Sequence, residues 1–211
     1  MTTTARTSHR PSRDSRELEA TDPGSTQSMW ECVLAVNPRR VDALHALGRI
    51  LMERGDQDGA FTLLRRALHE APSDAAIHRD LGKLHVARCN YGGALVHYWS
   101  ALRLRPRDAQ SMYEIGLIHS YRGDAGAAAA CFRKVLKLEP HFVPACYRLG
   151  VALQEQQRYE EAAVFLRQAL ELAPDHAEAQ AALTTVATAQ GAAAQKADGH
   201  DWGWLSGAMR A

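Results

Sequence analysis

Five of the eight prolines in this 211-residue chain follow a fixed spacing, and that spacing limits the fold more than any other feature. Successive members of the set lie 34 residues apart: Pro38, Pro72, Pro106, Pro140 and Pro174. A period of about 20–50 residues is typical of chains that stack one structural unit several times. We therefore expect an array of repeats, in which each proline follows the end of a helix because it disfavours helical backbone just before it.

Small and bulky residues follow the same period. The small positions are Gly48, Gly82, Gly116 and Gly150, together with Ala60, Ala94, Ala128 and Ala162. The bulky positions, four residues after each alanine, are Leu64, Tyr98, Phe132 and Leu166. Apolar residues recur at helical spacing in both halves of each unit, which predicts two amphipathic helices per unit. We expect the small residues to let the two helices approach closely and the bulky one to fill the contact with the neighbouring hairpin.

The sequence also marks the turn inside each hairpin. Gly55 and Gly123 can close the first helix in a left-handed conformation. The residues that can then cap the second helix are Asp56, Asn90 and Asp124. In the second unit Cys89 stands where the closing glycine is expected, and we expect Asn90 to take the left-handed conformation there.

These small, bulky and proline positions resemble the consensus of tetratricopeptide repeat proteins. The resemblance implies an all-α fold, a right-handed α-solenoid of stacked helix-turn-helix hairpins. It covers four full repeats at 41–74, 75–108, 109–142 and 143–176. A half repeat at 28–40 precedes them, with Trp30 in the bulky position and Val33 in the small one. A capping helix at about 177–190 is expected to follow, because an end unit must cover its apolar face.

Two tails complete the expected organisation. Residues 1–27 lack an apolar stretch, so we expect a disordered N-terminal tail rather than a secretory signal. Residues 191–211 are expected to form a flexible C-terminal tail that contains the sequence GHDWGWLSG. Its motif of Trp202, Trp204 and Leu205 has three alternative roles: it lies over the chain's own groove, binds in trans, or packs on the capping helix.

Composition excludes several functional classes. The formal charge is +1, from 25 basic and 24 acidic residues, so we expect no nucleic-acid partner. No apolar run approaches the roughly 20 residues that cross a bilayer, so we expect no membrane insertion. The four cysteines form no CxxC pair and no zinc pattern, which favours reduced thiols in a cytoplasmic protein.

In tetratricopeptide repeat proteins, the first helices line a concave groove that binds a partner peptide or helix. The resemblance places ten residues of this chain in such a groove: Arg49, Arg79, Lys83, Tyr113, Glu114, Leu117, Tyr121, Tyr147, Arg148 and Val151. We expect the later repeats to grip apolar or aromatic side chains and the earlier ones to read charge. The alternative is that Tyr113 and Tyr147 pack within the array. A clamp for a terminal carboxylate is not expected, because Asp80 and Glu114 would repel it.

The sequence therefore favours a non-enzymatic adaptor for a protein or peptide partner, with no cofactor. One alternative is a chaperone for exported or assembling subunits. A weaker alternative, a metal-dependent enzyme or its accessory subunit, rests on His78, His85 and His119, which match no metal-ligand motif. We expect neither a catalytic residue nor a metal site. A homodimer, formed through the N-terminal half repeat or the C-terminal tail, is left open.

Overall fold

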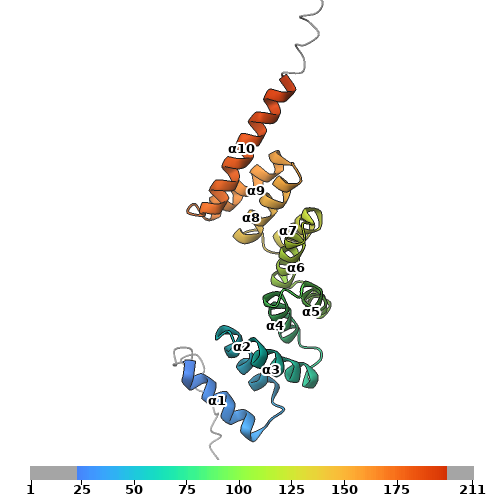
Figure 1. Cartoon of the computed structure of the whole chain (residues 1–211), viewed down its shortest axis with the longest axis vertical. Coiled ribbons are helices and arrows are strands. Elements are labelled where there is room, and N and C mark those ends of the chain that lie inside the picture. Colours follow the sequence, from blue (N-terminus) through green and yellow to red (C-terminus); the bar gives the residue numbers. More distant parts are fainter. Residues whose placement is uncertain (1–22, 199–211) are drawn as a thin grey trace, which may run out of the picture. The chain divides into compact units, whose positions relative to one another are not determined.

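The computed structural model describes residues 23–198, which form ten α-helices and no strands (Figure 1). The helices are α1 (Pro23–Val36), α2 (Val41–Glu53), α3 (Gln57–Glu70), α4 (Ala75–Ala87), α5 (Tyr91–Leu104), α6 (Ala109–Tyr121), α7 (Ala125–Leu138), α8 (Val143–Glu155), α9 (Tyr159–Leu172) and α10 (Ala177–Asp198). The expected all-α helical-repeat fold is confirmed. Among the described residues, no helix combines the length and apolar character that a membrane span requires.

The chain divides into two compact units, of which the first ends at Pro72. In this unit α2 packs against both α1 and α3. Its core contains Leu44 and Leu64, which are fully buried. The Arg66 guanidinium also donates to the carbonyl oxygen of Pro38 at 2.9 Å, which ties α3 to the loop before α2.

The second unit begins at Ser73 and contains three hairpins, α4/α5, α6/α7 and α8/α9, followed by α10. One apolar cluster joins α5, α6 and α7 through Tyr98, Met112, Ile115 and Val135. A second joins α7, α8 and α9 and includes Val186 of α10. Each cluster is shared between successive hairpins, which is how repeat units bury faces that none could bury alone.

The periodic glycines lie directly beneath the periodic bulky residues. A Cβ atom built on Gly82 would lie 2.8 Å from the Tyr98 ring, and one on Gly116 would lie 2.6 Å from the Phe132 ring. Bulky and small positions therefore meet inside a single hairpin, whereas we expected the bulky residue to fill the contact with its neighbour. The Phe132 ring does both, since it shares a cluster with residues of α8.

The predicted turn geometry is largely confirmed. Gly55 and Gly123 have φ of +83° and +75°. The three predicted caps accept hydrogen bonds from backbone amides: Asp56 from Gly59, Asn90 from Gly93 and Asp124 from Ala127. The prediction for the second hairpin is wrong in one respect. Cys89 itself is left-handed, with φ of 55°, and Asn90 has φ of −88° because it serves as the cap.

Two element boundaries differ from those expected. Helix α1 begins at Pro23, inside the segment 1–27 expected to be disordered. Helix α10 continues to Asp198, past the expected end near Gln190. It passes through Gly191 because the alanine-rich sequence that follows favours helix. The motif of Trp202, Trp204 and Leu205 lies outside the described residues.

Candidate functional site

The first helices of the second unit carry nine side chains at three repeating positions, and we call this set the α4–α6–α8 face. Its first row is Arg79, Tyr113 and Tyr147. Its second row is Asp80, Glu114 and Arg148. Its third row is Lys83, Leu117 and Val151. Eight of these nine residues were predicted to bind a partner; Asp80 was expected on the groove lining, where it would repel a carboxylate. Lys83 is exposed, Asp80 is buried, and the other seven are partly buried.

Each first-row side chain contacts the residue that ends its own repeat. The Arg79 guanidinium lies 3.5 Å from the Asp108 carboxylate. The Tyr113 ring meets the edge of the Phe142 ring at a centroid distance of 5.2 Å, and the Tyr147 and His176 centroids are 4.9 Å apart. Both tyrosines therefore pack against other residues of the array while part of each side chain stays accessible.

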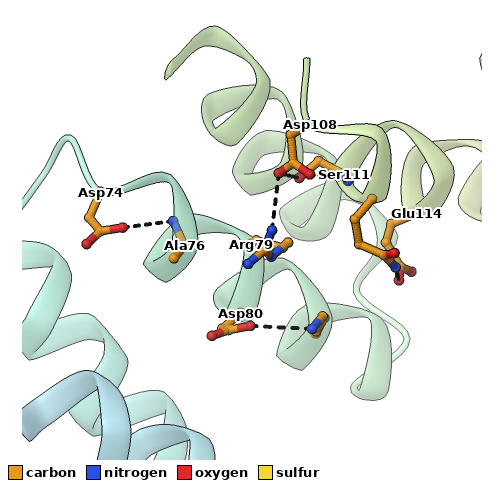
Figure 2. A network of polar contacts seen from close by, with 9 residues as sticks. Asp74, Ala76, Arg79, Asp80, Asp108, Ser111 and Glu114 are labelled. Carbon is orange, nitrogen blue, oxygen red and sulfur yellow. Dashed lines mark hydrogen bonds and ion pairs between the residues drawn. The ribbon is translucent and has the colours of Figure 1, made fainter. Parts of the chain in front are cut away.

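Asp108 is the centre of the polar network in Figure 2. It caps α6 by accepting from the Ser111 amide at 3.3 Å, and it also accepts from the Ser111 hydroxyl at 2.7 Å. Its contact with Arg79 joins the start of α6 to α4. Asp74 caps α4 in the same way, by accepting from the Ala76 amide. The sequence analysis missed both caps, although an aspartate directly before a helical stretch is their usual signal.

The second row has two acidic side chains and one basic side chain, and each has a different kind of neighbour. The Asp80 carboxylate is buried and lies 3.5 Å from the Lys83 ammonium. The Glu114 carboxylate accepts from the Gln110 side-chain amide at 2.9 Å. The Arg148 guanidinium lies 5.5 Å from the centroid of the Tyr147 ring. Burial raises the pKa of the Tyr113 phenol, and the positive charge of Arg148 opposes that rise.

Tyr98 of α5 packs against Gly82 of α4, and the surroundings of its hydroxyl group are unusual. The side chain is fully buried, and its oxygen has no hydrogen-bond partner in the described part of the chain. Burial raises the pKa of the phenol, and the charges of Glu114 and Asp80 raise it further. The corresponding residues of the other repeats, Leu64, Phe132 and Leu166, have no polar atom to satisfy.

Three histidines gather where α4 meets α5. The Nδ1 atoms of His78 and His97 are 3.1 Å apart, and the His85 and His97 rings stack at 5.3 Å. Burial, followed by the neighbouring imidazoles, lowers the pKa of His97 to about 4. His119, considered with His85 from the sequence, instead lies 3.8 Å from Asp124. The described residues contain no group of three or more side chains suited to hold a metal ion.

The remaining predicted residues lie elsewhere. Arg49 is exposed on α2 of the first unit. Tyr121 ends α6, and its ring stacks on that of Tyr91 with centroids 6.0 Å apart. The first unit also has an open pocket of ≈ 600 Å³, whose lining includes Phe61, Arg65 and Arg66. The sequence analysis did not identify this pocket, because no periodic pattern marks it.

Two family models match the chain. The middle TPR-like domain of cilia and flagella-associated protein 70 matches residues 90–206, and a tetratricopeptide repeat model matches residues 41–84. A search of curated proteins found no match.

Three solved structures of similar fold are distant in sequence. A crystal structure of MamA has 23% identity and a TM-score of 0.67, and the match covers 74% of this chain and 92% of that one. YrrB, described as a TPR protein with an unusual peptide-binding site, has 21% identity, coverages of 76% and 82%, and a TM-score of 0.65. A thermophilic TPR protein from Thermus thermophilus, TTC0263, has 22% identity, coverages of 79% and 91%, and a TM-score of 0.60. These similarities establish the fold.

Proposed function

The chain belongs to the tetratricopeptide repeat family, and from this premise we propose that it is a non-enzymatic adaptor that docks a partner protein segment on its α4–α6–α8 face. The family fold supports a protein-interaction scaffold. The printed description of YrrB, a protein of the same fold, mentions a peptide-binding site. The observation that carries our proposal is the repetition of three rows of accessible charged, aromatic and apolar side chains on consecutive first helices.

The contacts around this face favour binding without rearrangement. Asp108 fixes Arg79, while Phe142 and His176 hold Tyr113 and Tyr147. Side chains that are already ordered lose less conformational entropy when a partner binds. Tyrosines held in this way also offer a wide contact area while their hydroxyls stay polar. The adaptor would act by displaying these groups on rigid helices.

The proposed setting is the cytoplasm, where thiols stay reduced. All four cysteines are free, and two of them, Cys131 and Cys146, are buried. Burial raises the pKa of both buried thiols, which keeps them protonated and unreactive.

One pair of valines on a single hairpin gives a matched test. Val151 lies on the α4–α6–α8 face, whereas Val164 is 58% exposed on the second helix of the same hairpin. Peptides are selected from a random 12-residue display library on the immobilised full-length chain, and their Kd is measured by fluorescence polarisation. We expect Val151→Arg to weaken binding at least about 10-fold, because it places a long charged side chain on the proposed contact surface. Val164→Arg should leave the Kd unchanged.

Equal loss in both variants, or no loss in Val151→Arg, would exclude this face as the docking surface. The chaperone alternative makes a different prediction. A chaperone should keep an aggregation-prone client soluble on co-expression, whereas an adaptor should join proteins that are each soluble alone.

A further inference from the structure

The charged side chains of the α4–α6–α8 face differ in whether a side chain of opposite charge lies beside them. Asp80 has the ammonium of Lys83 at 3.5 Å, and in the first row Arg79 has the carboxylate of Asp108. Glu114 has only the neutral amide of Gln110, and Arg148 has the Tyr147 ring and the Tyr113 phenol. Within residues 23–198, no ion pair includes Glu114 or Arg148.

This arrangement leaves a carboxylate and a guanidinium that are each partly buried without a counter-charge. Partial burial removes some of the water that would otherwise stabilise these charges. The Gln110 amide beside Glu114 and the Tyr147 ring beside Arg148 are neutral, so they do not offset either charge. A ligand that brings a cation to Glu114 and an anion to Arg148 would supply what the folded chain lacks, and such complementarity gives specificity.

We propose that the α4–α6–α8 face selects a partner protein segment with two charged side chains: a lysine or arginine that docks on Glu114, and an aspartate or glutamate that docks on Arg148. This inference rests on the proposed adaptor function and specifies its ligand. Glu114 and Arg148 occupy equivalent positions on α6 and α8, so the segment must present its two charges to successive first helices.

The test uses the same random 12-residue library on the full-length chain, sequenced after selection on the wild type and on three variants. Wild-type binders should be enriched in a basic and an acidic residue within the same peptide. Glu114→Gln should remove the enrichment in basic residues and keep that in acidic ones, while Arg148→Gln should do the reverse. Each of these two variants should weaken the best wild-type peptide at least about 10-fold.

The third variant, Arg133→Gln, is the control, since Arg133 on α7 is a charge already paired with Glu161 at 3.3 Å. It should leave both enrichments and the affinity unchanged.

The outcomes distinguish this inference from the proposed function. Selected peptides without the paired charges, or with an enrichment that Glu114→Gln and Arg148→Gln do not change, would overturn the inference while the adaptor function stands. A library that yields no binder would overturn both the adaptor function and the specificity derived from it.

Discussion

His97 shows how much the surroundings of one side chain can change its chemistry. It lies on α5 between His78 and His85 of α4, in contact with both imidazoles. Burial is the main reason that its pKa falls to about 4, and the two neighbouring rings lower it further. A protonated His97 would bring a positive charge into a site with little water, so the folded protein keeps this ring neutral at pH 7.

We predict that His97 makes the stability of the chain depend on pH between 7 and 5. The unfolded chain binds a proton at His97 near pH 6.5, whereas the folded chain does so only near pH 4. The stabilisation is therefore fully present above pH 6.5 and is lost as the pH falls toward 4. Urea unfolding should show a free energy of unfolding about 2 kcal/mol lower at pH 5 than at pH 7 from this residue. His97→Gln should flatten the dependence, and the exposed control His141→Gln should not; an unchanged slope in His97→Gln would refute the assignment.

The sequence could not predict the histidine cluster, although it predicted most helix caps. A cap is a local signal, because the side chain bonds an amide two or three residues later, as Asp124 does with Ala127. The period of 34 relates His85 to His119, but equivalent positions in successive repeats need not touch. His97 belongs to neither position, and only the packing of α5 on α4 brings it to His85.

At the scale of elements, the approach of two helices depends on a missing side chain. Helix α6 meets α7 where the Phe132 ring covers Gly116, and a Cβ atom there would lie 2.6 Å from the ring. Gly126, in the first turn of α7, has no such neighbour: its nearest atom, the Asp124 carboxylate oxygen, is 3.6 Å away. The two glycines therefore have opposite effects on the stability of one hairpin.

We predict that Gly116→Ala destabilises the chain by about 1–3 kcal/mol, because the buried ring and helix must move apart to admit a methyl group. Gly126→Ala should be neutral or stabilise it by up to about 1 kcal/mol, because alanine favours helix and has space there. Thermal unfolding of the two variants beside the wild type measures both effects. Equal shifts in Tm would show that the close approach of α6 and α7 does not depend on Gly116.

For the whole molecule, the period predicted the hairpins because it reports contacts that recur in every repeat. It says less about the ends of the array, where no further repeat follows. The extension of α10 to Asp198 depends on local alanine content rather than on the period. The α4–α6–α8 face is predicted by the period only in part. The period locates its three rows, but only the structure shows that Asp108 balances Arg79 while Glu114 lacks a cation.

Helix α10 closes the second unit, and its removal tests how much the array depends on an end cover. Its Ala179 and Val186 are fully buried in the cluster that contains Leu153, Leu166 and Ala169. We predict that a chain ending at Asp175 loses several kcal/mol of stability and aggregates, because each large apolar side chain left uncovered costs about 1.5–3 kcal/mol. A chain ending at Ala192 keeps both buried residues and should unfold within about 0.5 kcal/mol of the full-length protein. Urea unfolding and size-exclusion chromatography of the two truncations give the comparison. If the chain ending at Asp175 stayed monodisperse and equally stable, α10 would not be a structural cap, and its apolar face would have to be explained by another partner.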